Sequence, residues 1–251
     1  MRAILLCAGQ GKRLLPLTER EPKCLLPVDD HRSILEFQLA ALARGGLRSV
    51  CVVAGFGANR VEERLRAART PGIDVEVVYN PFFAVSDNLV SCWVARSAMS
   101  DDFLLLNGDT VFEAAVLDRV LDDPSPIAVA IDRKPRYDDD DMKVSLAADR
   151  LLAIGKTLPA DRVDGESIGL LAFRGSGAPT FRDAVLRAVR RPEALRAWYL
   201  AAVDEIARDA VVNRVDIEGL WWREVDDRDD LCELQSCICD GRVSGKLLAR
   251  P

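Results

Sequence analysis

The segment that decides the fold is 2–23, RAILLCAGQGKRLLPLTEREPK. Its first six residues include five apolar ones, and such a short run predicts a strand buried on both faces, as in a parallel sheet. Glycines at positions 9 and 11 and prolines at 16 and 22 follow, so the strand leads into a loop. Because ligands of open α/β sheets bind beyond the carboxyl ends of strands, this loop is a candidate binding site.

The composition of this loop favours a polyphosphate ligand. Gly9 and Gly11 would let backbone N–H groups approach a phosphate closely. Residues 1–28 carry five basic and two acidic side chains, a local charge of +3 in a chain of net charge −6. Two well-known phosphate motifs are excluded, because Leu14 replaces the third glycine of the dinucleotide fingerprint and no GxxxxGK[ST] segment exists.

Strands and helices alternate outward from this segment. In the first half we expect strands at 2–7, 50–54, 75–79, 103–106 and 127–131, and helices at 33–43, 59–68, 88–99 and 113–121. This order predicts an α/β fold with a Rossmann-like, doubly wound, mostly parallel sheet. The second half predicts a small mixed extension, with strands at 143–146, 151–154, 168–173 and 211–217 and helices at 179–190, 194–208 and 229–239. We therefore expect one domain with two halves, 1–132 and 133–251.

Composition excludes several classes of function. The net charge of −6 argues against nucleic acid or an anionic membrane surface as partner, and no apolar run is long enough to span a membrane. The single histidine, His31, excludes Ser-His-Asp hydrolases and sites with several histidine ligands. Seven cysteines, mostly in apolar runs, indicate buried thiols in a reducing cytoplasm. Their C-terminal cluster Cys232, Cys237 and Cys239 does not have zinc-site spacing.

The complete loop pattern, G-x-G-x-R-x-x-P-x-T-x-x-x-P-K over residues 9–23, closely resembles the signature of a family of nucleotidyltransferases. These enzymes join a nucleoside triphosphate to a phosphorylated small molecule. Further segments resemble the family's motifs in the expected order, namely 107–109, 154–156, 165–169 and 222–226. The resemblance covers nearly the whole chain, and it implies a nucleotide-binding half at 1–132 and an acceptor-binding half at 133–251.

The resemblance also implies a mechanism and its residues. An acceptor phosphate or phosphonate oxygen attacks the α-phosphorus in line and pyrophosphate leaves, so that no general base is needed. Arg13, Lys23 and Lys156 would neutralise the phosphates, and Asp109 and Asp226 would hold Mg²⁺, or Mn²⁺ in its place. The expected nucleotide contacts are Leu6, Ala8, Gly9, Gly11, Asn88, Ser91 and Gly108, and the expected acceptor contacts are Lys143, Glu166 and Trp222.

The subgroup is indicated by Asn80-Pro81 followed by Asn88-x-x-Ser91. This pattern stands where uridylyl- and thymidylyltransferases carry Q-x-x-P-x-G. It is similar to cytidylyltransferases for phosphocholine, aminoalkylphosphonates and inositol phosphate, so we expect CTP and an acceptor with an amine or quaternary ammonium. A sugar- or cyclitol-phosphate enzyme using another triphosphate, and a non-catalytic regulatory module, remain as alternatives. A homodimer is also left open.

Each candidate residue also has a plain structural explanation. Asp109 and Asp226 could cap helices, and Asn88 could be the N-cap of its own helix. Lys156 could be a solvated hairpin residue, and segment 138–141 favours a solvated loop. As a loop residue, Lys23 is expected to be exposed and to contribute little to stability.

Overall fold

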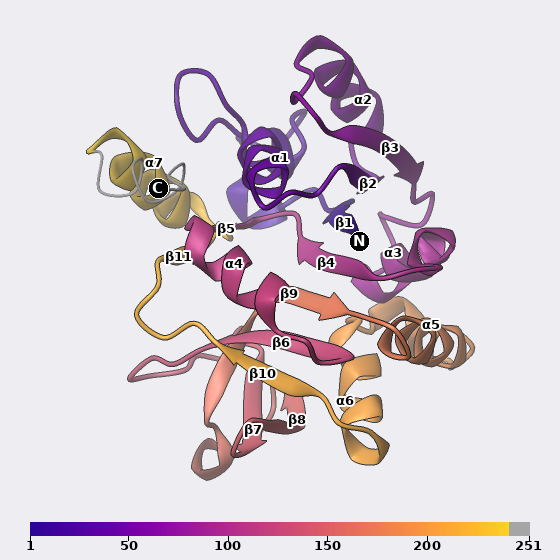
Figure 1. Cartoon of the computed structure of the whole chain (residues 1–251). Coiled ribbons are helices and arrows are strands. Elements are labelled where there is room, and N and C mark those ends of the chain that lie inside the picture. Colours follow the sequence, from indigo (N-terminus) through magenta and orange to yellow (C-terminus); the bar gives the residue numbers. More distant parts are fainter. Residues whose placement is uncertain (241–251) are drawn as a thin grey trace.

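A mixed sheet of nine strands forms the centre of the protein in the computed structural model, which describes residues 1–240 (Figure 1). Its strand order is β3-β2-β1-β4-β9-β6-β10-β8-β7. These strands are β1 (Arg2–Cys7), β2 (Ser49–Ala54), β3 (Asp74–Tyr79), β4 (Phe103–Asn107), β6 (Ile127–Asp132), β7 (Lys143–Ala147), β8 (Arg150–Gly155), β9 (Gly165–Phe173) and β10 (Asn213–Asp216). A separate antiparallel ribbon joins β5 (Thr110–Phe112) to β11 (Trp222–Glu224).

The sheet is parallel at one end and mixed at the other. Strands β3, β2, β1 and β4 run parallel, and residues of β1 alternate between the two core faces, with Ile4 on one and Ala3 and Leu5 on the other. Strand β9 comes from the second half of the sequence and lies between β4 and β6, antiparallel to both. Strand β7 pairs with β9 as well as with β8, so this end of the sheet curls back on itself.

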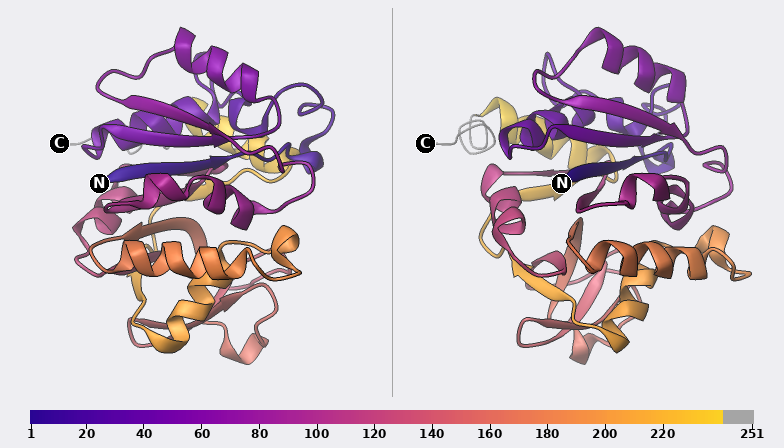
Figure 2. Two further views of the ribbon diagram at one scale, coloured as in Figure 1. Left: turned by 90° about the vertical axis from the view of Figure 1, so that its right-hand side faces the viewer. Right: turned by 45° about the vertical axis from the view of Figure 1, so that its right-hand side comes forward.

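Seven α-helices are assigned within residues 1–240: α1 (Ile34–Arg44), α2 (Ala58–Ala67), α3 (Asn88–Val94), α4 (Ala114–Asp122), α5 (Gly177–Ala188), α6 (Leu200–Asp209) and α7 (Arg228–Cys239). Helices α3, α5 and α6 contribute to the apolar core on one sheet face, and α1, α2 and α4 to the core on the other. The left view of Figure 2 brings α3 and α5 to the front, with α7 on the far side. The predicted doubly wound α/β architecture is confirmed.

The β5–β11 ribbon was not expected from the sequence. It packs with α1 and α7 in a third apolar cluster that includes Phe37, Val111, Val225 and Leu231. Because β5 follows Asp109 directly and α4 begins only at Ala114, the alternative explanation that Asp109 caps a helix is wrong. Pairing of β5 with β11 therefore brings the residues that follow β4 close to the residues that follow β11.

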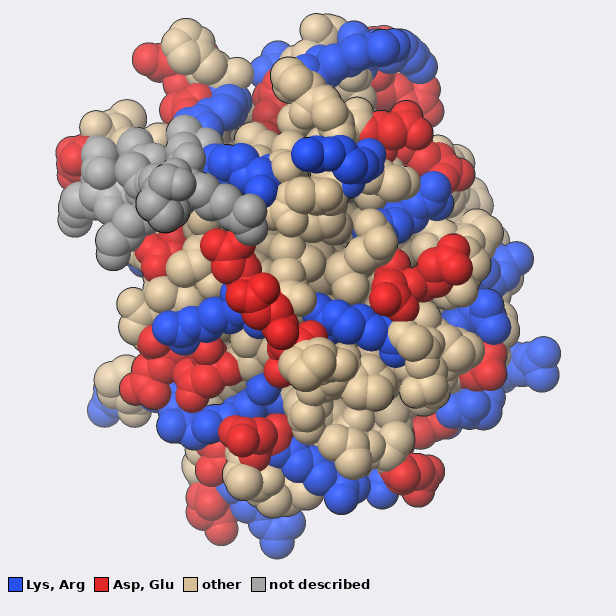
Figure 3. Space-filling view, in the orientation of Figure 1, with Lys and Arg blue, Asp and Glu red and all other residues tan. Residues whose placement is uncertain are grey.

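Several local predictions are confirmed with small changes at the element ends. Ser33 caps α1 in a reciprocal capping box with Glu36. The helix expected at 88–99 ends at Val94 and continues as a 3₁₀ turn, Arg96–Met99. Within residues 1–240, no helix is long and apolar enough to cross a membrane. On the face shown in Figure 3, acidic and basic side chains are interspersed.

Candidate active site

A cavity of about 1030 Å³ opens at the carboxyl ends of β1 and β4. Residues from the first loop, from α3, from the end of β4, from β9 and from the β11 segment line it. The residues predicted from the sequence that lie in its wall are Leu6, Ala8, Gly9, Arg13, Lys23, Asn88, Ser91, Gly108, Asp109, Lys156, Glu166, Trp222 and Asp226. The fold therefore gathers side chains that span more than 200 positions of the sequence into one site.

Glycines shape the backbone beside the carboxyl ends of β1 and β4. Gly11 adopts a left-handed conformation with φ of 73°, and its carbonyl accepts a 2.7 Å hydrogen bond from the Thr18 hydroxyl. Gly11 is not among the residues that line the cavity, so it contributes to the conformation of the loop rather than to the cavity wall. Gly108 packs against β1, where a Cβ atom would lie 2.5 Å from the Leu6 carbonyl oxygen. A larger residue at position 108 would separate the two strand ends.

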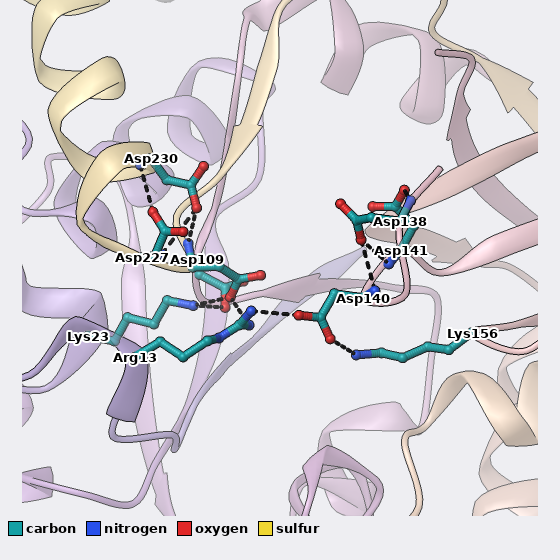
Figure 4. Close-up of polar contacts among 10 residues, drawn as sticks. Arg13, Lys23, Asp109, Asp138, Asp140, Asp141, Lys156, Asp227 and Asp230 are labelled. Atoms are coloured by element: carbon teal, nitrogen blue, oxygen red, sulfur yellow. Dashed lines mark hydrogen bonds and ion pairs between the residues drawn. The ribbon is translucent and has the colours of Figure 1, made fainter. Parts of the chain in front are cut away.

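Lys23 lies at the centre of the site rather than on an exposed loop surface. Its ammonium donates to Asp109 Oδ2 at 2.7 Å and to Asp226 Oδ1 at 2.9 Å, and its side chain is 12% exposed (Figure 4). Burial alone would lower the pKa of Lys23, but the two carboxylates outweigh it and raise the pKa above its ordinary value. The expectation of an exposed Lys23 is therefore wrong.

Three carboxylates converge beside this lysine. Asp109, Glu224 and Asp226 place ligand atoms within 4.8 Å of one another. Asp109 Oδ1 is buried and has no hydrogen-bond partner within the described residues. Burial, together with the neighbouring carboxylates Asp109 and Asp226, raises the pKa of Glu224 to about 8. Glu224 was missed from the sequence, although side chains two positions apart on an extended segment share a face.

Asp140 links the first loop to the opposite wall of the cavity. Its Oδ2 accepts from Arg13 Nη1 at 2.8 Å and its Oδ1 accepts from Lys156 Nζ at 3.0 Å (Figure 4). Lys156 and Arg13 together hold the pKa of Asp140 below its ordinary value. Segment 138–141 is thus part of the site wall, and the expectation of a merely solvated loop is wrong.

A second charged group lies at the β9 end of the cavity. Glu166 is 3% exposed, and its Oε2 accepts from Lys134 Nζ at 2.9 Å. Burial raises the pKa of Glu166 to about 7, against the opposing effect of Lys134. The Trp222 indole N–H donates to Asp132 Oδ2 at 2.6 Å, and Asp132 pairs in register with Glu166 across β6 and β9. Lys134 and Asp132 had not been singled out in the sequence.

Polar residues in and before α3 hold the cavity wall in place. Ser91 is buried, and its hydroxyl accepts from the Asn80 amide at 3.0 Å. Asn88 Oδ1 accepts from the backbone N–H of Tyr199 at 2.9 Å. Asn88 is the first residue of α3 and Asp87 occupies the N-cap position, so the alternative explanation of Asn88 as an N-cap is wrong.

Two other expectations are changed by the geometry. Asp227, rather than Asp226, caps α7 in a capping box with Asp230, which leaves the Asp226 carboxylate free to face Lys23 and Arg13. Lys143 does not line the cavity. Its ammonium donates instead to the backbone carbonyls of Asp138 and Lys156.

Comparison with known proteins places this site in a family context. Among curated proteins, the chain is 34% identical to the CMP-5'-(3-aminopropyl)phosphonate synthase of Streptomyces rubellomurinus, with 92% of this chain and 37% of that protein covered. It is 25% identical to the bifunctional IPC transferase and DIPP synthase of Aquifex aeolicus, with 97% and 53% covered. The chain therefore spans between about a third and a half of the length of these relatives.

Solved structures share the same fold. The CTP:phosphocholine cytidylyltransferase of Streptococcus pneumoniae superposes with a TM-score of 0.77 at 18% identity, with 94% of this chain and 98% of that chain covered. The inositol-1-phosphate CTP transferase of T. maritima superposes with a TM-score of 0.78 at 20% identity, with 96% of both chains covered. Residues 2–137, more than half of the chain, match the family model described as nucleotidyl transferase. The chain therefore belongs to the nucleotidyl transferase family.

Proposed function

We propose that this protein transfers CMP from CTP to a small acceptor that carries a phosphate or phosphonate group, with release of pyrophosphate. The arrangement of Arg13, Lys23 and Lys156 around one cavity carries the proposal. Two polyanions must meet for this reaction, and fixed cations lower the repulsion between them. The halves 1–132 and 133–251 would bind the nucleotide and the acceptor, respectively.

In the proposed reaction an acceptor oxyanion attacks the α-phosphorus. A new P–O bond forms as the bond between the α-phosphorus and the pyrophosphate oxygen breaks, and pyrophosphate carries away the electron pair. The nucleophile is already anionic, so the chain need not supply a general base. Arg13 projects from the first loop and would bind the leaving pyrophosphate, while Lys156 on the opposite wall would bind the acceptor phosphate. Lys23 lies deeper and would contact the α-phosphate.

The acidic centre has the donor chemistry of a divalent cation site. Asp109 and Asp226, with Glu224 beside them, offer carboxylate oxygens that Mg²⁺ or Mn²⁺ prefers, and the unpartnered Asp109 Oδ1 is open to such a ligand. When bound, the ion would supply positive charge against the phosphate oxygens. In the structure described here, the Lys23 ammonium balances these carboxylates.

The choice of CTP is supported by the relatives, two of which are named for CMP or CTP chemistry on a phosphonate and on phosphocholine. Asn80 and Ser91 form the polar wall expected of a base-binding site, and both line the cavity.

The free thiols Cys7, Cys24, Cys51 and Cys92 support the expectation of a reducing cytoplasm.

Pyrophosphate release tests the proposal directly. CTP, UTP, GTP, ATP and dTTP are each paired with phosphocholine, 2-aminoethylphosphonate, inositol 1-phosphate and glucose 1-phosphate. We expect release with CTP and a small phosphate or phosphonate. The acceptor KM should rise in the Lys156→Met variant but not in Lys12→Met, which changes an exposed lysine of the first loop. Release with UTP or dTTP and glucose 1-phosphate alone would favour the sugar-phosphate alternative, and no release with any pair would contradict catalysis.

A further inference from the structure

Both ends of the acceptor side of the cavity are filled by charges of the chain itself. At one end, the Asp140 carboxylate lies between Arg13 and Lys156, the two cations proposed for phosphates (Figure 4). Asp140 is 61% exposed at its side chain, so burial does not require this position. A carboxylate held by two separate cations is in the position expected of a bound anionic ligand.

At the other end, the Lys134 ammonium lies between two carboxylates. Its Nζ donates to Asp141 Oδ2 at 2.8 Å and to Glu166 Oε2 at 2.9 Å. Asp132 stands opposite Glu166 in the sheet, and like charges placed directly opposite destabilise a strand pair. Within residues 1–240, Lys134 is the one cation paired with Asp141 and Glu166, and Asp132 accepts only from the neutral Trp222 indole, so when all three carboxylates are ionised two negative charges remain unbalanced.

The two internal charges belong to one short segment, 134–141. Asp138 Oδ1 accepts from the backbone N–H groups of Asp140 and Asp141, and the Lys143 ammonium holds the Asp138 and Lys156 carbonyls. These bonds hold the turn that carries Asp140 and Asp141. The segment presents an ammonium and a carboxylate to the two ends of the same cavity.

We propose that segment 134–141 is an internal substitute for the acceptor, and that the acceptor is a zwitterion whose anionic group replaces Asp140 and whose primary ammonium replaces Lys134. This inference rests on the proposed function and specifies its acceptor class. A primary ammonium can donate to both Asp141 and Glu166, as Lys134 does. A quaternary ammonium has no N–H group, and a neutral polyol leaves the excess negative charge unbalanced.

Equilibrium binding to two matched probes tests this inference without requiring turnover. Calorimetric titrations compare 2-aminoethylphosphonate with ethylphosphonate, which lacks only the amine, in the presence and absence of a nonhydrolysable CTP analogue. We expect the amine to improve the affinity about tenfold or more, because it makes hydrogen bonds to charged groups. Equal affinities, or no binding of either probe in either condition, would overturn the inference.

Two variants separate the two ends of the site. Lys134→Met removes the competing ammonium and should tighten 2-aminoethylphosphonate several-fold, with no change for ethylphosphonate. Asp140→Asn frees Arg13 and Lys156 and should tighten both probes equally. Asp161→Asn is the matched control, because Asp161 is exposed, does not line the cavity and has no ion pair within residues 1–240.

The outcomes distinguish this inference from the proposed function. Weaker binding of 2-aminoethylphosphonate to Lys134→Met would show that Lys134 is itself a ligand for the anion and would overturn the substitution idea. If CTP reacts with inositol 1-phosphate while the amine gives no gain in affinity, the proposed function stands and the zwitterion inference fails. If the amine selects binding but no acceptor releases pyrophosphate, the inference stands and the proposed transfer fails.

Discussion

Replacing Lys23 by methionine removes the positive charge at the centre of the site while it keeps nearly the same side-chain length. The substitution leaves the carboxylates of Asp109 and Asp226 without the ammonium that lies 2.7 and 2.9 Å from them. Glu224 lies in the same cluster. We therefore expect Lys23→Met to destabilise the fold as well as to abolish turnover.

The size of this effect follows from the burial of the cluster. Removing one partner of a buried ion pair costs about 3–5 kcal/mol, but the Asp109 and Asp226 side chains are 22% and 27% exposed, so we expect about 2–3 kcal/mol. For a chain of this length, that loss corresponds to a fall in Tm of about 4–12 °C. Mg²⁺ can supply the missing charge, so it should stabilise the variant more than the wild type.

Thermal unfolding with EDTA and with Mg²⁺ measures both effects. The control is Lys12→Met, since Lys12 is exposed in the same loop and has no ion pair within residues 1–240. An unchanged Tm for Lys23→Met in EDTA would refute the assigned ion-pair geometry. A Mg²⁺-induced shift in Tm equal to that of the wild type would refute the idea that the cation and Lys23 balance the same carboxylates.

Three further outcomes are expected. Turnover should stop in EDTA, and Asp109→Asn and Asp226→Asn should each lower it by about 10²-fold or more; full activity in EDTA would contradict a metal site. Initial rates should favour CTP over UTP by about tenfold or more, because a site that pairs with the cytosine amino group leaves polar groups unpaired with uracil; a preference for UTP would contradict this. The kcat/KM ratio of 2-aminoethylphosphonate to ethylphosphonate should fall as the pH drops through about 7, because Glu166, which faces Lys134, Asp141 and Asp132, then gains a proton and loses its attraction for the ammonium. Glu166→Gln should make that ratio independent of pH, and an unchanged profile in this variant would assign the titration to another group.

The secondary-structure predictions that the structure confirms rest on sequence signals that act over a few residues. The apolar run of β1, the glycines of the first loop and the capping sequence at Ser33 act over a few residues, and each gives the structure expected from it. The same holds for the hairpin of β7 and β8, whose turn includes Ala148 at a positive φ. Arg13, Lys156 and Asp226 were predicted as site residues from the resemblance of their motifs to those of the family, and all three line the cavity.

Only the tertiary structure shows which strands become neighbours in the sheet and in the β5–β11 ribbon. Strand β9 separates β4 from β6, and no local pattern encodes which strands become neighbours. The β5–β11 ribbon has three-residue strands whose stability comes from pairing with each other and packing against α7, so neither is evident in isolation.

By itself, the sequence determined the α/β class, the glycine-containing first loop and most of the charged side chains that line the cavity. Pairing across long sequence separations placed Glu224 beside Asp109 and Asp226, and it buried Lys23 among them. It also set Asp140 between Arg13 and Lys156. The physical reason is that burial and charge pairing depend on neighbours brought together by the sheet, whereas propensity and side-chain chemistry are properties of each segment alone.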